Sequence, residues 1–162
     1  MKLSFSIFVT TLFLCLMPFS ISHAAEGGVI QKDPNDRFCL NLHLNDGRDD
    51  ATVNLWSCNG HDSQYWKLYN DGTIRHGAFP RMCLNLHFNA NIDGAVINLW
   101  TCNQHDSQQW VYQKTDNTIR HAVFRNKCLN LHFNASHDGA VVNLWSCNNH
   151  ESQRWKVSPQ AS

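Results

Sequence analysis

The sequence predicts an all-β domain built from three similar units that close into a ring. Three observations support this prediction. A unit of 44 or 45 residues recurs three times, apolar and polar residues alternate within each unit, and no long segment carries a helical stripe. An open array of repeats needs distinct capping units, and none of the three looks like a cap. We therefore expect roughly twelve short strands, four in each unit, in a closed structure.

The recurring unit is defined by three segments. It opens with Cys-Leu-Asn-Leu-His, continues with Asn-Leu-Trp followed by a second cysteine, and ends with Gln-x-Trp. The closing tryptophans are Trp66, Trp110 and Trp155. We place the domain at residues 25–162, with a first unit at about 28–70, a second at about 71–114 and a third at about 115–158.

Alternation inside the unit predicts which side chains share a face. In residues 39–44 the three leucines, Leu44 included, fall on one face, whereas Cys39, Asn41 and His43 fall on the other. In residues 53–58 the aromatic Trp56 falls on the face away from the leucines. We therefore expect a leucine core and an opposite face that carries asparagine, histidine and tryptophan.

The N-terminus resembles a secretory signal peptide at residues 1–24. Lys2 precedes a mostly apolar stretch from Leu3 to Ile21, and small residues before Ala24 and Ala25 fit a cleavage site. A membrane anchor is the alternative, but the stretch contains polar residues and a proline. Cleavage would remove one of the seven cysteines, leave a net charge of −1 and place the protein outside the cell or in the periplasm.

The six remaining cysteines occur as two per unit, always 19 positions apart. Of the fifteen ways to pair six cysteines, threefold repetition favours pairing within each unit. Each bridge would close a loop of about twenty residues and stabilise the fold by about 3 kcal/mol. A zinc site is the alternative, but the close Cys-x-x-Cys pairs of zinc ribbons are missing from the sequence. The predicted pairs are Cys39–Cys58, Cys83–Cys102 and Cys128–Cys147.

Composition and charge argue against several classes of function. Thirteen basic and thirteen acidic residues give a net charge of zero, without the basic surface of a general nucleic-acid binder. Glycoside hydrolysis needs a pair of carboxylates across a cleft, and here the acids are scattered in triplicate. We expect no catalytic residues, no cofactor and no metal.

The three Gln-x-Trp endings, the Cys-Leu-Asn openings and the Asn-Leu-Trp-x-Cys-Asn segments resemble the ricin B-type (R-type) lectin family, from about Ile30 to Val157. The resemblance implies a β-trefoil with pseudo-threefold symmetry, in which the Gln-x-Trp tryptophans belong to the core. It also implies sugar binding on the exposed face of each unit, with one aromatic side chain stacked on the sugar and polar side chains around it.

Carried over position by position, the resemblance implies twelve carbohydrate-binding residues. They are Asn41, Asn54, Trp56 and Gln64 in the first unit, Asn85, Asn98, Trp100 and Gln108 in the second, and Asn130, Asn143, Trp145 and Gln153 in the third. An aromatic ring covers the apolar face of a pyranose, and amides donate to and accept from its hydroxyls. Two alternatives remain, namely that the tryptophans pack on the disulfides and that the first asparagines serve turns.

One departure from the family pattern recurs in all three units. The family has an acidic residue where this chain has Asn41, Asn85 and Asn130. Because a carboxylate accepts stronger hydrogen bonds than an amide, the change predicts weaker galactose binding or a different sugar. A replacement carboxylate could come from beside the Gln-x-Trp motif or from the loop before the tryptophan strand, unless these acids serve turns. The candidates are Asp62, Asp106 and Glu151, and Asp49 or Asp50, Asp93 and Asp138.

Nine histidines follow the signal peptide, and six of them recur beside the predicted sites. They would donate hydrogen bonds to sugars or simply cover the surface. If all nine had ordinary pKa values, the protein would become strongly cationic below about pH 6. The six are His43, His87 and His132, and His61, His105 and His150.

We therefore predict a secreted, multivalent lectin that binds glycans, with galactose-type or related sugars as the first guess. No binding to nucleic acid and no membrane insertion are expected. The alternatives are the cell-binding subunit of a toxin assembly, which would have a partner subunit, and a trefoil with vestigial sugar sites that binds protein.

Overall fold

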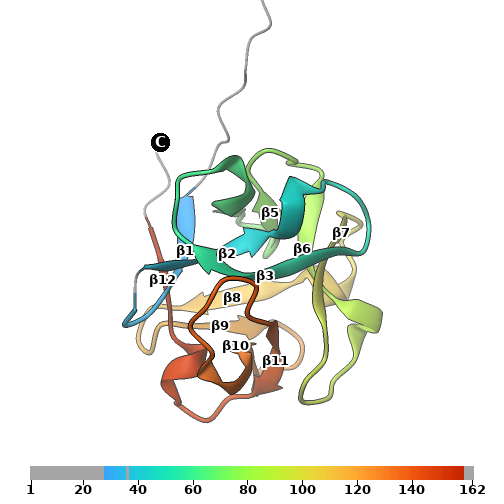
Figure 1. Ribbon diagram of the computed structural model, residues 1–162. Coiled ribbons are helices and arrows are strands. Elements are labelled where there is room, and N and C mark those ends of the chain that lie inside the picture. The colour runs from blue at the N-terminus through green and yellow to red at the C-terminus, as the bar shows by residue number, and fades with distance from the viewer. Residues whose placement is uncertain (1–27, 36, 159–162) are drawn as a thin grey trace, which may run out of the picture.

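The computed structural model describes residues 28–35 and 37–158, and these ranges contain twelve β-strands and six short 3-10 turns (Figure 1). The predicted signal peptide lies outside the described residues. The strands are β1 (Gly28–Lys32), β2 (Phe38–Leu42), β3 (Ala51–Ser57), β4 (Tyr65–Leu68), β5 (Ile74–His76), β6 (Met82–Leu86), β7 (Ile97–Thr101), β8 (Trp110–Gln113), β9 (Thr118–His121), β10 (Lys127–Leu131), β11 (Val142–Ser146) and β12 (Trp155–Val157).

Each unit contributes four strands, and the second and third of them form an antiparallel hairpin. These hairpins are β2–β3, β6–β7 and β10–β11. The fourth strand of one unit pairs with the first strand of the next, as in β4–β5 and β8–β9. The pair β12–β1 joins the last unit to the first, so the units close into a ring as the sequence predicts (Figure 1).

The closing tryptophan of each unit is a core residue, as predicted. Trp66 is 1% exposed, and its indole Nε1 donates a hydrogen bond of 3.0 Å to the carbonyl of Leu40, at the start of the same unit. The bond satisfies the polar atom of an otherwise apolar side chain. Trp110 and Trp155 make the same bond to Leu84 and Leu129.

The three predicted disulfides are confirmed. Cys39 bonds to Cys58, Cys83 to Cys102 and Cys128 to Cys147. Each joins the second strand of its unit to the end of the third, so it ties together the hairpin that carries the predicted site tryptophan.

The prediction for Leu44 is wrong, because the strand ends at Leu42 and the chain enters a 3-10 turn at His43–Asn45. Leu44 adopts a left-handed backbone (φ 55°), which turns its side chain outward and leaves it 83% exposed. Phe88 and Phe133 occupy the same position in the other units and are 88% and 89% exposed. Alternation does not predict this reversal, because it holds only while the chain stays extended.

One aspartate of each unit forms hydrogen bonds to the next unit, and we call each of these contacts a clasp. Asp49 Oδ1 accepts hydrogen bonds from the backbone N–H (2.5 Å) and the hydroxyl (2.7 Å) of Thr101 in the second unit. Asp93 binds Ser146 of the third unit in the same way, and Asp138 binds Ser57 of the first. The three clasps therefore run around the ring in one direction.

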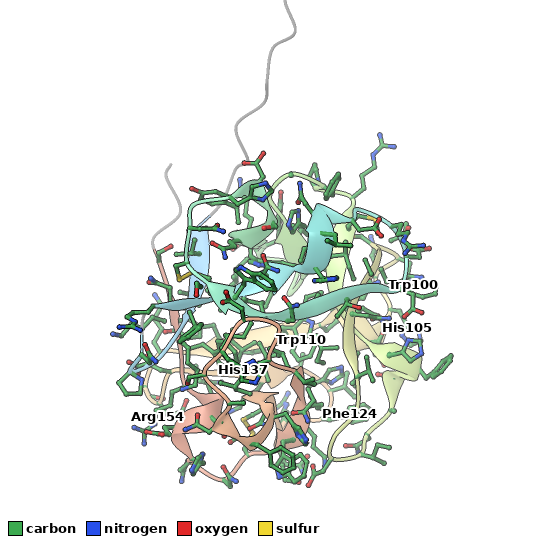
Figure 2. All side chains as sticks on the ribbon, viewed as in Figure 1. Trp100, His105, Trp110, Phe124, His137 and Arg154 are labelled. Carbon is green, nitrogen blue, oxygen red and sulfur yellow. A yellow bond between two sulfur atoms is a disulfide. The ribbon has the colours of Figure 1, made fainter. Side chains whose placement is uncertain are left out.

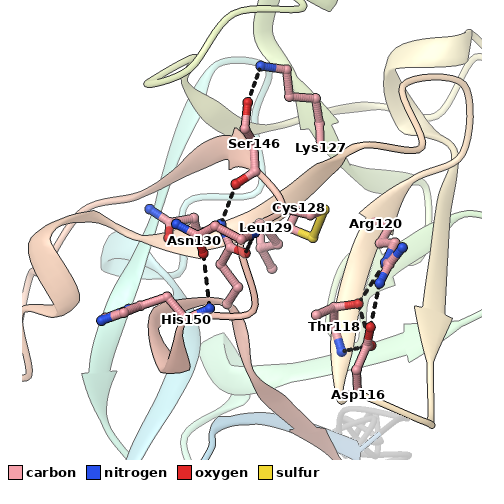
Figure 3. The surroundings of a disulfide bond; sticks show 12 residues. Asp116, Thr118, Arg120, Lys127, Cys128, Leu129, Asn130, Ser146 and His150 are labelled. Carbon is pink, nitrogen blue, oxygen red and sulfur yellow. Dashed lines mark hydrogen bonds and ion pairs between the residues drawn. A yellow bond between two sulfur atoms is a disulfide. The ribbon is translucent and has the colours of Figure 1, made fainter.

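The third-unit clasp contains an additional cation. Lys127 Nζ lies 3.1 Å from Ser146 Oγ (Figure 3). It also lies 2.6 Å from Asp93 Oδ1, and the lysine is 8% exposed. Burial alone would raise the pKa of Asp93, but the hydrogen bonds from Lys127 and Ser146 hold this pKa below its ordinary value. Phe38 and Met82 stand at the position of Lys127 in the other units.

The prediction of nine ordinary histidines is wrong for two of them. His76 and His121 are 1% and 0% exposed, and each packs edge-on against a core tryptophan, Trp66 or Trp110. Burial lowers the pKa of both rings to about 4, since nearby backbone and carboxylate groups compensate only in part. Lys32 takes the same place in the first unit, where its Nζ donates to the carbonyls of Asp33 and Glu151.

Two further features of residues 28–35 and 37–158 bear on function. No helix there is long and apolar enough to cross a membrane. No group of three or more His, Cys, Asp or Glu side chains in the same ranges is arranged to hold a metal ion.

Candidate functional site

The predicted asparagines lie together in a buried polar network beneath the outer face of each unit. In the second unit, Asn85 Nδ2 donates to Asn98 Oδ1 (2.8 Å), and Ser107 Oγ donates to Asn85 Oδ1 (2.8 Å). Both asparagines are buried, at 6% and 1% exposure. The other units repeat the network with Asn41, Asn54 and Ser63, and with Asn130, Asn143 and Ser152.

This network gives a physical reason for asparagine where the family has an acidic residue. Asn85 must accept from Ser107 and also donate to Asn98, and an amide does both, whereas an ionised carboxylate only accepts. An aspartate at this position would place two acceptors against each other unless Asn98 reversed its amide. The recurring substitution is thus part of a consistent arrangement.

A histidine stands at the outer end of each network. In the second unit, His105 Nδ1 accepts from the backbone N–H of Ser107 (3.2 Å) at the start of a 3-10 turn, Asp106–Gln108. The same nitrogen lies 3.0 Å from Ser107 Oγ, so both polar groups of Ser107 contact Nδ1 and Nε2 is the ring nitrogen left to face a ligand. His61 and His150 have the same arrangement in the other units.

Above the network lies an open pocket with aromatic walls. The pocket of the second unit, the second pocket, has a volume of about 370 Å³ and is lined by Asn85, His87, Phe88, Trp100, Asn103 and His105. Trp100 is partly buried on the third strand, and it lies with His105 at one edge of the molecule, whereas Trp110 lies toward the centre (Figure 2). The pocket thus combines an apolar wall with polar groups.

The pocket of the third unit, the third pocket, is built in the same way. It has a volume of about 350 Å³ and is lined by Asn130, His132, Phe133, Trp145, Asn148 and His150. In the first unit, Trp56 and His61 occupy the corresponding positions, but Leu44 stands where the other units have phenylalanine. We refer to these first-unit positions, which the repeat alone identifies, as the first pocket.

The exposed Phe88 is a residue that sequence reasoning missed. Its backbone and that of Asn89 are both left-handed (φ 53° and 50°), and its ring lies 3.8 Å from that of His87, between centroids. A left-handed backbone costs a non-glycine residue on the order of 1 kcal/mol, so the rest of the structure must enforce it. The signal in the sequence is an apolar residue after the motif histidine, followed by asparagine, which tolerates this backbone.

The predicted glutamines lie below the pocket and not in it. Gln108 is fully buried, its Oε1 accepts from the backbone N–H of Asn103 (2.9 Å), and its Nε2 donates to the carbonyl of Thr101 (3.0 Å). These bonds fix the loop that carries Asn103 and His105. Gln64 and Gln153 make the equivalent bonds, so all three glutamines support the pockets from beneath.

The candidate carboxylates separate into two groups. Asp49, Asp93 and Asp138 form the clasps between units, whereas Asp62, Asp106 and Glu151 are exposed residues that begin 3-10 turns. Glu151 also accepts from Asn134 Nδ2 (2.6 Å) at the edge of the third pocket. Asp50 differs from all of them because it contacts the site residues of the second unit.

Comparison with known proteins identifies the class to which this fold and these sites belong. Residues 26–155 match the ricin-type β-trefoil lectin domain, so the chain belongs to that family. No sequence among the curated proteins matches the chain.

Solved structures share the fold at low sequence identity. A designed threefold symmetric protein, ThreeFoil, superposes with a TM-score of 0.74 at 22% identity, over 82% of this chain and 98% of that one. The β-trefoil lectin of the Vibrio vulnificus hemolysin/cytolysin, solved with N-acetyl-D-lactosamine bound, gives 0.64 at 21% identity, over 86% and 98%. A mosquitocidal holotoxin gives 0.70 at 19% identity, over 81% of this chain but only 17% of the toxin.

Proposed function

We propose that the protein is a secreted lectin that binds neutral glycans in three outward-facing pockets, one in each unit. The observation that carries this proposal is the second pocket, where the half-buried Trp100 and the exposed Phe88 stand above a buried amide network. A pyranose offers an apolar patch of C–H groups and a rim of hydroxyls, and this arrangement matches both.

Each group in the pocket has a distinct part in the proposal. The Trp100 ring stacks on the apolar face of the sugar, and Phe88 forms a second wall. His105 Nε2 forms a hydrogen bond with a hydroxyl, which can donate or accept, and Asn103 supplies further polar contact from the rim. Asn85, Asn98 and the glutamines hold these groups in place from beneath. The network is charge-neutral in the first and third units, so it does not select for a charged sugar, and galactose and its N-acetylated relatives are the candidates.

Secretion is supported by the three disulfides, which persist in oxidising compartments, and by the apolar N-terminal segment. Three weak pockets on one rigid body would bind strongly to a surface dense in glycans, because the second contact is made at high effective concentration. We therefore expect the protein to agglutinate cells. Binding rather than catalysis is proposed, since the pockets contain no pair of facing carboxylates among the residues described.

Calorimetric titration with methyl β-galactoside and N-acetyllactosamine tests the proposal. We expect W100A to remove about one of three binding sites and the triple variant W56A/W100A/W145A to abolish binding, while V123A, an exposed apolar control outside the pockets, changes neither. If no sugar binds across a glycan array, or if binding persists in the triple variant, the proposal is wrong.

A second candidate is the cell-binding subunit of a toxin assembly. It is favoured by the similarity to lectin domains within a mosquitocidal holotoxin and a hemolysin/cytolysin. Expression with the neighbouring genes of its source, followed by affinity purification on immobilised galactose, would recover a toxic partner chain if this candidate is right.

A further inference from the structure

The loop before the third strand of each unit lies against the site of the next unit. The backbone N–H of Asp50 donates to the carbonyl of Leu99 in the second unit (2.9 Å). Gly94 makes the same bond to Leu144 of the third unit (2.8 Å), and Gly139 makes it to Leu55 of the first (2.9 Å). A side chain at this loop position therefore belongs to the pocket of the following unit.

Only the loop of the first unit carries a side chain there. All three positions have a left-handed backbone, with φ values of 66°, 86° and 82°, and two of them are glycine, which tolerates it. Asp50 adopts the same conformation with a side chain, at a cost on the order of 1 kcal/mol. A glycine would adopt this backbone at lower cost, so the loop conformation does not explain why the first unit has an aspartate here.

The Asp50 carboxylate connects directly to the network under the second pocket. Its Oδ1 accepts from Asn98 Nδ2 (2.8 Å) and lies 3.6 Å from His87 Nδ1. Asn98 Nδ2 also lies 3.0 Å from His87 Nδ1, a contact that recurs in the other units, so the carboxylate adds a charged acceptor to an amide orientation that all three units share. The side chain is still 65% exposed, so it can accept further hydrogen bonds from outside.

At the third pocket, this loop position also lies close to the tryptophan. At the equivalent Gly94, a Cβ atom would stand 3.9 Å from Cζ3 of Trp145 in the third unit. At the third equivalent position, Gly139, a Cβ would meet no atom within 4 Å. The direct contact of Asp50 with the second site is therefore through His87, which lines the second pocket. A carboxylate supplied by the neighbouring unit thus adjoins a residue that lines the second pocket, and the other two units have glycine at this loop position.

We propose, on the basis of the lectin function proposed above, that Asp50 makes the second pocket a distinct subsite that prefers neutral sugars and rejects acidic ones. A sugar hydroxyl beside Trp100 donates a charge-assisted hydrogen bond to the carboxylate, which is stronger than a bond to a neutral acceptor. A carboxylated sugar such as a uronide meets like charge at the same place. The first pocket has Gly139 at this place and discriminates less between the two kinds of sugar, whereas the third has glycine there but carries Glu151 at its edge.

The test isolates the second pocket in the variant W56A/W145A. Methyl β-galactoside and methyl β-galacturonide are titrated against this protein by calorimetry, with and without D50G. We expect D50G to weaken the neutral sugar about fivefold to tenfold and to strengthen the acidic one, since the charge-assisted bond and the repulsion are both lost. D50G restores the residue of the other units, and a melting temperature that does not fall shows that the loop is intact.

Two further variants separate charge from position. D50N keeps an acceptor for Asn98 but removes the charge, and we expect it to lose the preference for the neutral sugar as D50G does. G139D places a carboxylate beside the first pocket, where a Cβ meets no atom within 4 Å, and should create the preference there in a W100A/W145A protein. If W56A/W145A binds galactoside and D50G alters neither affinity, this proposal alone is overturned. If the unmutated protein binds no sugar, the lectin function fails and this proposal fails with it.

Discussion

The first and second units share the same scaffold, and three of their differences lie at the site or in the core near it. Both contain the disulfide, the core tryptophan, the buried glutamine and the Asn-Asn-Ser network. At the core position, the first unit has Lys32 and the second has His76. At the pocket rim, Leu44 of the first unit corresponds to Phe88 of the second. The loop of the preceding unit supplies a glycine to the first unit and Asp50 to the second. The repeat thus preserves what builds a pocket and varies what lies beneath it and what faces a ligand.

The largest effect should come from the core position, where two units have histidine and one has lysine. His76 and His121 have folded pKa values of about 4 against an ordinary 6.5, so the unfolded chain binds more protons between these values. Their contribution to stability is complete above pH 6.5 and is lost as the pH falls toward 4, by on the order of 3 kcal/mol for each ring. The unfolding free energy from guanidinium titration at pH 7 and pH 4.5 measures this loss.

The double variant H76Q/H121Q is the control, because glutamine does not titrate. It is expected to be less stable at pH 7 but to lose much less stability between the two pH values. An equally steep loss would mean that other groups cause the acid sensitivity.

A smaller effect should distinguish the clasps. D49A removes two hydrogen bonds at an exposed position and should cost about 1 kcal/mol of unfolding free energy. D93A also leaves the buried ammonium of Lys127 without its carboxylate partner and should lower the unfolding free energy by about 3 kcal/mol. The loss is smaller than at a fully buried pair because Asp93 is one-third exposed. Denaturant midpoints of the two variants at one pH give the comparison.

Lys127 itself provides the control for the clasp. K127M introduces the residue that the second unit has at this position, Met82, and removes the cation. In the K127M protein, D93A should cost no more than D49A does. A cost that stays at about 3 kcal/mol would place the origin of the difference in the loop and not in the buried charge.

The smallest effect concerns the rim. In the W100A/W145A protein only the first pocket keeps its tryptophan, and L44F should strengthen its binding of galactoside about threefold to tenfold by adding an aromatic wall. The reciprocal F88L in the W56A/W145A protein should weaken the second pocket by a similar factor. Calorimetry measures both, and no change in either direction would exclude the residue at this position from the ligand contact.

Local repetition in the sequence was enough to predict the fold and part of the site. The period, the cysteine spacing and the Gln-x-Trp endings predicted the three-unit ring and all three disulfides. The positions of Trp100, Asn85 and Asn98 also followed from strand alternation and family resemblance, and the structure brings them to one place.

The remaining features depend on contacts that the sequence pattern does not contain. Phe88 was missed because a left-handed turn interrupts the alternation, and Gln108 faces the core because its amide is needed by two backbone groups. Asp50 and Asp93 act across the boundary between units, and nothing local identifies their partners. His76 appears polar in the sequence but lies under a tryptophan of the preceding unit.

The one-way order of the clasps bears on how such a chain can arise or be cut. Asp49 binds the second unit, Asp93 the third and Asp138 the first. The strand that carries the site tryptophan in each unit is therefore bonded by an aspartate of another unit. A peptide of one unit alone would leave its aspartate without the hydrogen-bond donors, and its Ser or Thr without the carboxylate acceptor, that the neighbouring units supply. Three separate copies in a ring would supply every clasp, as would a permuted chain opened at any unit boundary. The one-way order of the clasps is thus compatible with three identical units meeting in a ring, whether or not they are joined in one chain.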